Sequence, residues 1–355
     1  MHIPDGYLSP ATCAVLYGGA TPFWYAGLRR VKKALHTRLI PQISLFAAFS
    51  FVIMMFNLPL PGGTTGHAVG IGLATVVLGP WAAMLAVSVA IVIQALFFGD
   101  GGITAIGANC FNMAIAGALA AYVVYRVVAG RAAIGSFRRA AAAGIAGYAA
   151  INVSALLAAI EFGIQPLLYR DASGAPLYCP YPLGIAVPAM MIGHLTIAGL
   201  AELAVSAGVV AFLQHSEPSL LKATLPKGMA TRGESPRTVR ARSLRPLWAG
   251  LGMLLILTPL GILAAGSAWG EWMASDYSNP AARQQIAASS LGDAPPLQVP
   301  KGIEQLSSLW TAPFGRYAPP YVRSATFGYL LSAMFGVGLI TTTGLIVGRF
   351  TRAAT

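Results

Sequence analysis

Charged residues are scarce in this chain. Only 10% of its 355 residues are Asp, Glu, Lys or Arg, whereas soluble domains hold about one quarter. Hydrophobic residues make up 56%, and the mean hydropathy is +0.67. The formal charge of +12 does not indicate a nucleic-acid partner, because the basic residues fall between apolar runs and not on a soluble surface. The composition therefore predicts an integral membrane protein.

Cysteine is also scarce, and two catalytic motifs are missing. The three cysteines, Cys13, Cys110 and Cys179, form no CxxC pair and no disulfide framework, so we expect small packing residues. The sequence contains no GxxxxGK[ST] phosphate loop, which excludes ATP hydrolysis by that route. It also contains no HExxH motif, which argues against an intramembrane metalloprotease.

Long apolar runs set the number of helices. They cover about 11–28, 40–58, 68–98, 103–125, 140–165, 183–213, 247–268 and 325–348. A membrane-spanning helix needs about 20 residues. The run 68–98 is long for one helix and short for two, and Gly79-Pro80 interrupts it. Proline after glycine breaks or kinks a helix, so this run has two interpretations.

The basic residues decide between them, because Lys and Arg concentrate in cytoplasmic loops. If 68–98 is two short helices, 18 of the 23 basic residues fall on the cytoplasmic side and the N-terminus lies outside. These residues cluster at 29–38, 126–139, 222–245 and 349–352. A single crossing would put the 126–139 cluster outside. We therefore expect nine helical segments in a bacterial inner membrane, seven up to about residue 213 and two after it.

The same pattern divides the chain into two modules. Residues 1–213 form the first module, 214–246 a basic and flexible cytoplasmic linker, and 247–355 a second, two-helix module with an outer loop of about 270–324. Aromatic residues in or beside this loop suit a membrane interface, with gating or partner contact as the alternative. No positive charge precedes the run 11–28, so we expect no cleaved signal peptide and a retained N-terminus.

The first residues have the chemistry of a metal chelator. In Met1-His2-Ile3-Pro4-Asp5-Gly6, the α-amine, the amide nitrogen of His2 and its imidazole can bind one metal through a five-membered and a six-membered ring. Histidine at position two leaves one corner of a square free. Planar nitrogen coordination favours Ni(II) or Cu(II) over Zn(II). Pro4-Asp5-Gly6 predicts a turn that folds the terminus back. An accidental histidine in a frayed tail is the alternative.

His67 is the candidate fourth donor. It follows a Gly- and Thr-rich loop, and the charge-based topology puts it on the same side as His2. Taken alone, it could be an ordinary loop histidine, but together with His2 it predicts a metal site on the uptake side. His36 and His215 lie beside basic residues, and we expect both to face solvent or lipid headgroups.

The opening Met1–Leu8, together with Gly66-His67, resembles the nickel/cobalt substrate-specificity subunits of energy-coupling-factor transporters. The resemblance covers about 1–213 and extends to the segment 107–113. It implies a seven-helix bundle with the N-terminus tucked into its core, and metal binding by Met1, His2 and His67. Residues 247–349 are similar to the family's small two-helix companion subunit, here fused. The implied partners are a coupling transmembrane subunit and two ATPase subunits.

Other polar residues are candidates for supporting roles. Thr64, Thr65, Asn109 and Asn112 could orient the metal donors, or they could make ordinary interhelical hydrogen bonds. His194 and Glu202 lie within one apolar run, where ionisable groups are costly and usually functional. They could contact the coupling partner or make a buried structural hydrogen bond. Glu161 lies near a helix end, and we expect it to be solvated.

These features predict a transporter subunit and not an enzyme. It would capture Ni(II) or Co(II), with nickel favoured by planar nitrogen coordination, for ATP-driven import, and it would need no organic cofactor. The sequence does not decide between the two metals. The alternative is a proton-coupled secondary transporter of transition metals, in which Glu161, His194 and Glu202 would form a relay.

Overall fold

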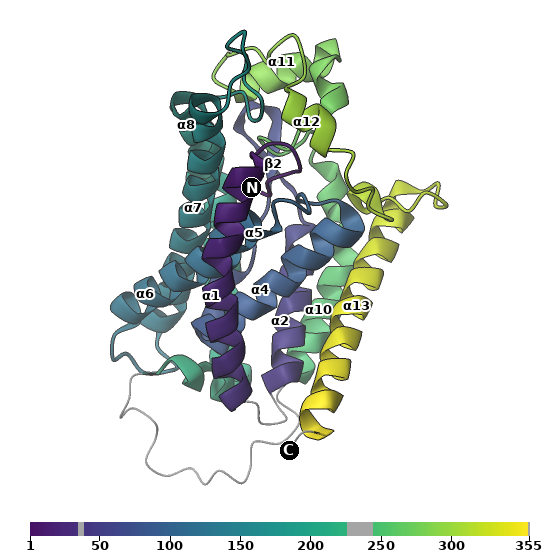
Figure 1. Cartoon of the computed structure of the whole chain (residues 1–355). Helices are drawn as coiled ribbons and strands as arrows, with labels where there is room; N and C mark the ends of the chain where they lie inside the picture. Colours follow the sequence, from purple (N-terminus) through teal and green to yellow (C-terminus); the bar gives the residue numbers. More distant parts are fainter. Residues whose placement is uncertain (35–38, 226–243, 354–355) are drawn as a thin grey trace.

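The computed structural model describes residues 1–34, 39–225 and 244–353, and almost all of its regular structure is helical (Figure 1). Six helices are long and apolar enough to cross a membrane: Pro80–Phe98, Ile106–Ala129, Phe137–Leu168, Leu183–Ser216, Arg245–Leu263 and Ala325–Arg349. A shorter apolar helix covers Leu39–Met54. The predicted all-α, multi-pass membrane fold is confirmed.

Within residues 1–34 and 39–216, the first module contains nine α-helices, joined in places by π-helical turns. They are α1 (Pro10–Ala34), α2 (Leu39–Met54), α3 (Ile71–Leu78), α4 (Pro80–Ile93), α5 (Ile106–Asn109), α6 (Gly117–Ala129), α7 (Phe137–Leu168), α8 (Leu183–Gly193) and α9 (Gly199–Ser216). The π-helical turns are Gln94–Phe98, Cys110–Ala116 and His194–Ala198. Because the last two continue one helix into the next, the described residues up to Ser216 form seven helical segments, as predicted.

The break in the run 68–98 falls where the sequence predicts it. Helix α3 ends at Leu78, and Gly79 adopts φ 78°, a left-handed value that glycine tolerates without a Cβ clash. Pro80 then begins α4 with its φ already helical. The eight residues of α3 extend only about 12 Å, so α3 is too short to span the membrane by itself.

A small hairpin precedes α3, where the sequence predicts only a loop. Strand β1 (Leu58–Leu60) pairs antiparallel with β2 (Thr64–Gly66), and a 3-10 turn at Pro61–Gly63 joins them. Gly62 has φ 80° in this turn. The Thr65 N–H donates to the Ser267 carbonyl at 3.3 Å, so the hairpin also joins the second module. Two three-residue strands carry too little alternation to be read from sequence.

The second module has the two predicted long helices, α10 (Arg245–Leu257), which continues as a 3-10 helix to Leu263, and α13 (Ala325–Ala353). Between them lies the segment 264–324, which we call the outer loop after its predicted position, and it holds α11 (Pro280–Ser289) and α12 (Lys301–Leu306). Figure 1 shows α11 and α12 in the upper part of the molecule with the N-terminus, while α13 runs along one side toward the opposite end.

The outer loop corrects one prediction. Trp269, Trp272, Tyr277 and Tyr317 are buried, so they pack inside the protein and do not face a membrane interface. Trp269, for example, lies 5.7 Å from Phe162 of α7 between ring centroids. Other aromatic residues of the loop, Trp310 and Tyr321, are exposed. Aromatic residues near a membrane span do not show whether they lie in the protein interior or at the membrane interface, because both environments favour large amphipathic rings.

The first residues of the predicted linker 214–246 have regular structure. Helix α9 continues to Ser216, and residues Pro218–Thr224 form a 3-10 helix. Leu220, Leu221 and Thr224 are buried there, and the Thr224 hydroxyl donates to the Val76 carbonyl at 2.9 Å. This stretch therefore packs against the end of α3. Residues 226–243, like His36, lie outside the described residues.

Candidate metal site

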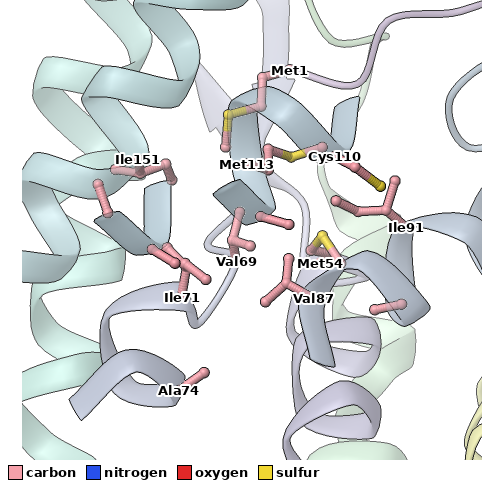
Figure 2. Packing of buried hydrophobic residues seen from close by; sticks show 14 of the residues in the cluster. Met1, Met54, Val69, Ile71, Ala74, Val87, Ile91, Cys110, Met113 and Ile151 are labelled. Atoms are coloured by element: carbon pink, nitrogen blue, oxygen red, sulfur yellow. The ribbon is translucent and has the colours of Figure 1, made fainter. Parts of the chain in front are cut away.

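The N-terminal segment is part of the core. Met1 is 4% exposed, while His2 and Ile3 are fully buried. The Ile3 N–H donates to Asn109 Oδ1 at 2.8 Å, and Asn109 Nδ2 donates back to the Ile3 carbonyl at 3.1 Å. The Met1 side chain enters the hydrophobic cluster that also contains Met113 and Val69 (Figure 2). The predicted insertion of the N-terminus into the bundle is confirmed.

The turn at Asp5-Gly6 fixes the direction of this segment. The Asp5 carboxylate accepts hydrogen bonds from the backbone N–H groups of Ile103 at 3.1 Å and Thr104 at 2.8 Å. Gly6 has φ 85°, and a Cβ there would lie 2.5 Å from the Gly302 carbonyl oxygen of α12. Only glycine fits this position. The predicted turn is confirmed, and its contact with the second module is a finding of the structure.

His2 and His67 meet at this site although 65 positions separate them in the sequence. Their ring centroids lie 5.2 Å apart, with the planes inclined by 38°. His67 is 6% exposed and directly follows the hairpin, whose close pairing carries the chain back toward the N-terminus. The structure therefore brings together the donors that the sequence selects, namely the buried α-amine, His2 and His67.

The His67 ring is prepared to act as a neutral donor. Its Nδ1 lies 3.1 Å from the Ala68 carbonyl oxygen, which places the proton on Nδ1 and leaves the lone pair on Nε2. Burial, followed by the nearby positive charges of His2 and the α-amine, lowers the pKa of His67 to about 3. A metal bound by Nε2 would therefore not have to displace a proton from this ring.

Two carboxylates that the sequence reasoning missed contact the other donors. The Met1 α-amine donates to Glu271 Oε1 at 3.1 Å, and His2 Nδ1 lies 2.5 Å from Asp100 Oδ1. Tyr317 donates its hydroxyl to Asp100 Oδ2 at 2.6 Å. The second module thus reaches both donor residues, directly through Glu271 and indirectly through Tyr317. The rarity of acidic residues could have pointed to these two carboxylates, since the chain has only 11 Asp and Glu residues.

The charge on Asp100 follows from its surroundings. Burial raises the pKa of its carboxyl, but the adjacent His2 ring and the hydrogen bond to it outweigh this effect and hold that pKa below its usual range. Asp100 is therefore an anion beside His2. His2 Nε2, in contrast, is buried and has no hydrogen-bond partner.

A cavity of about 680 Å³ reaches His67 and the two carboxylates, Asp100 and Glu271. The two modules both line it, with Asp5, Tyr7, His67 and Asp100 from the first and Glu271 and Tyr317 from the second. Its lining holds three acidic residues, Asp5, Asp100 and Glu271, and one basic residue, Arg316. This excess of negative charge suits the approach of a cation. The cavity places His67 within reach of a small ion.

Side chains alone do not make a metal site here. Within residues 1–34, 39–225 and 244–353, no group of three or more His, Cys, Asp or Glu side chains has an arrangement that could hold a metal ion. Metal binding at His2 and His67 would therefore need main-chain nitrogen atoms as further ligands.

The four other residues predicted beside the donors have different positions. Asn109 holds the Ile3 backbone and thereby the residue after His2. Thr65 lines the cavity, while Thr64 donates its hydroxyl to the Pro61 carbonyl at 3.3 Å within the hairpin. Asn112 donates to Glu161 Oε2 at 2.8 Å. Asn109 is thus the member of this set with a direct hold on the N-terminal segment.

The membrane-embedded ionisable residues do not form one cluster. His194 Nδ1 lies 2.7 Å from the Met190 carbonyl oxygen, and Glu202 accepts backbone N–H groups at the start of α3. Glu161 is only 8% exposed, so the expectation of a solvated position is wrong; its carboxylate binds Asn112 within the bundle. His215 is exposed at the end of α9, as expected.

Three comparisons relate this geometry to known proteins. The model of the CbiM family, described as the cobalt uptake substrate-specific transmembrane region, matches residues 2–220. The fused nickel transport protein NikMN of Rhodobacter capsulatus is 57% identical over 96% of this chain and 95% of its own. The cobalt transport protein CbiM of Geobacter sulfurreducens is 32% identical over 73% of this chain and 72% of its own.

A solved structure gives the same result for the first module. The crystal structure of a truncated transition metal transporter is 47% identical and covers 60% of this chain and 98% of its own, with a TM-score of 0.57. The match to NikMN extends across both modules, which agrees with a fused architecture. The chain therefore belongs to the CbiM family of metal-uptake transmembrane proteins.

Proposed function

We propose that this protein captures Ni(II) or Co(II) as a transported substrate on the outer side of the plasma membrane. The observation that carries the proposal is the meeting of the His2 and His67 rings at 5.2 Å beside the buried α-amine. The relatives include one named as a nickel transport protein and one named as a cobalt transport protein. Four nitrogen donors favour nickel when they lie in a plane.

The donors are the Met1 α-amine, the His2 amide nitrogen, His2 Nδ1 and His67 Nε2. Nδ1 is the ring nitrogen of His2 that can close a six-membered ring with its own amide nitrogen. Its present partner, Asp100 Oδ1, therefore yields to the metal when it binds. Glu271 similarly exchanges its contact with the ammonium form of Met1 for one with the coordinated amine. Both carboxylates remain near the bound cation and offset its charge.

Import against a gradient requires partners in this proposal. The sequence has no phosphate loop, so ATP hydrolysis would come from two ATPase subunits joined through a coupling transmembrane subunit. The test is uptake of radioactive nickel into proteoliposomes. We expect accumulation only when all subunits and ATP are present.

Accumulation by this chain alone, driven by a proton gradient, would instead support the secondary-transport alternative. The geometry does not favour a relay for it. Glu161, His194 and Glu202 are hydrogen-bonded to Asn112, Met190 and the start of α3 respectively, and not to one another.

The donor assignment is tested by nickel affinity. His67→Ala should weaken Ni(II) binding roughly hundredfold and replace a yellow, diamagnetic four-nitrogen complex with one that contains water. His215→Ala is the matched control, because that ring is exposed at the end of α9. An octahedral complex with mainly oxygen ligands, or unchanged affinity in His67→Ala, would reject the assignment.

The orientation of the chain can be tested with two cysteine variants. Gly174 and Gly135 are exposed, and neither has an atom within 4 Å of an added Cβ, so the new side chain meets no clash at either site. At Gly174, where φ is 83°, the left-handed backbone costs the variant about 1–2 kcal/mol. The native cysteines are buried and add little background. An impermeant thiol reagent should label Gly174→Cys in intact spheroplasts and Gly135→Cys only after lysis. The reverse pattern would place the N-terminus in the cytoplasm.

A further inference from the structure

The carboxylate of Glu202 lies entirely inside the bundle and accepts three backbone hydrogen bonds from the chain that follows His67. Glu202 is 0% exposed and belongs to α9. Its Oε2 accepts the backbone N–H groups of Val69 at 2.7 Å and Gly70 at 2.8 Å, while Oε1 accepts that of Gly72 at 3.2 Å. An unpaired buried carboxylate is expensive, so this arrangement requires all its partners.

The first turn of α3 depends on this carboxylate. The first N–H groups of a helix have no partner within the helix. Gly70, at the N-cap, adopts φ 74° and has no side chain that could accept from them. Glu202 from α9 takes the place of a local cap. The positive end of the helix dipole also favours a negative charge at this position.

Close helix packing makes the contact possible. A Cβ on Gly72 would lie 2.5 Å from Gly147 Cα of α7 and 2.7 Å from the Ser206 hydroxyl oxygen of α9. Ser206 also donates to Glu202 Oε1 at 3.3 Å. The three helices therefore approach one another at two glycines, and α9 can bring its carboxylate to the backbone of α3.

His67 lies in a two-residue segment, His67-Ala68, which we call the His67 bridge because both of its neighbours are held in place. On one side, the hairpin pairs Gly66 with Leu58. On the other side, Glu202 holds Val69, two residues after His67. Only His67 and Ala68 separate these anchors, and both are buried. Glu202 thus helps to determine the position of the His67 imidazole through the backbone of Val69, although it does not contact the ring.

We propose that Glu202 is a positioning residue for His67, and that it sets the strength and geometry of metal binding through the Val69–Gly72 backbone. The inference rests on the proposed role of His67 as a metal donor. It also gives α9 a direct mechanical connection to the site, because any displacement of Glu202 along the helix moves the anchor of the His67 bridge.

The test is a double-mutant cycle on Ni(II) affinity, measured by competition with a chelator on the full chain in detergent. Glu202→Gln keeps the shape but replaces an accepting oxygen with a donor that opposes the backbone N–H groups. We expect it to weaken nickel binding about 10- to 100-fold, as disturbed supporting residues do elsewhere. Its nickel absorption spectrum should move toward that of His67→Ala. Combined with His67→Ala, it should weaken binding no further.

The control is Glu161→Gln, which changes another buried carboxylate that binds a side chain and not the α3 backbone. It should keep nearly native affinity. If Glu202→Gln does not fold, Ser206→Ala removes the 3.3 Å hydrogen bond and should give a smaller loss that also disappears in the His67→Ala background.

The outcomes separate the two claims. Native affinity and spectrum in Glu202→Gln, or a full additional loss on top of His67→Ala, would overturn the positioning role and leave the metal site intact. Native affinity in His67→Ala would overturn the proposed function, and the inference with it.

Discussion

The N-terminal segment and the outer loop of the second module lie against each other, yet they are built differently. In the segment, Met1, His2, Ile3, Tyr7 and Leu8 are all buried, and the first module holds their backbone. The outer loop buries some aromatic residues but leaves Leu291, Leu297 and Tyr321 exposed. The N-terminal segment is therefore part of the hydrophobic core. The outer loop, in contrast, lies over this segment as a partly exposed cover. Changes to the segment should abolish binding, and changes to the loop should adjust it.

The largest effect should follow from extending the N-terminus by a short tag. The tag converts the α-amine into an amide, which removes one proposed donor, and it needs space where Met1 is only 4% exposed. We expect nickel affinity to fall by more than roughly hundredfold, because a donor and the local packing are both lost. Isothermal titration compares the tagged chain before and after a protease restores the native Met1.

A tag at the other terminus serves as the control, since α13 ends away from the N-terminal segment (Figure 1). Tight nickel binding by the extended chain would show that the α-amine is not a donor, and the distinction between core segment and cover would lose its functional meaning.

A smaller effect is expected where the two regions touch. Gly6→Ala adds a Cβ at φ 85° that would lie 2.5 Å from the Gly302 carbonyl oxygen. Gly174→Ala is matched in backbone geometry, with φ 83°, but has nothing within 4 Å. The left-handed conformation costs each variant about 1–2 kcal/mol. Gly6→Ala should lose a further ~1–3 kcal/mol, because two backbones must separate.

Thermal unfolding in detergent measures both glycine variants. Equal losses would mean that the contact between Gly6 and α12 adds nothing to stability. A larger loss in Gly6→Ala together with weaker nickel binding would show that the cover supports the segment.

Much of this architecture could be predicted from the sequence, because the signals were strong and local. Apolar runs gave the helices, and Gly79-Pro80 gave the break between α3 and α4. The donors His2 and His67 followed from the chemistry of position two and from a shared side of the membrane. Their meeting at 5.2 Å depends on the tertiary fold, which no local pattern encodes.

The remaining features could not be predicted for the same reason. Glu271 reaches Met1 across 270 positions, and Glu202 binds α3 from 130 positions away. The expectation that Glu161 is solvated was wrong because a residue near a helix end can face a neighbouring helix as readily as water. Asp100 was missed because its contact with His2 joins residues 98 positions apart.

The ion pair across the two regions should have a modest effect. Glu271→Gln keeps an acceptor for the Met1 amine but removes the charge, and the carboxylate is 21% exposed. A pair at this depth is worth about 1 kcal/mol. We expect a slightly lower unfolding temperature. Asp171→Asn, whose partner Lys301 is 3.7 Å away and exposed, should have no measurable effect. A large loss in Glu271→Gln would mean that the cover is as essential as the core segment.

The smallest expected effect concerns pH and separates the core histidine from the chain end. Burial lowers the pKa of His67 to about 3, so its ring is neutral in the folded protein from about pH 5 upward. A histidine in the unfolded chain gains a proton below about pH 6.5. The contribution of His67 to folding stability is therefore complete above about pH 6.5 and declines as the pH falls toward 3. Nickel binding near neutral pH should release no proton from His67, because its ring is already neutral before the metal binds. The slope of log affinity against pH, measured between about pH 6 and 8, should thus be the same in the native chain and in His67→Ala, even though the affinities differ. A slope lower by one proton in His67→Ala would show that His67 is protonated before the metal binds, and that its surroundings are wetter than the buried bridge described above.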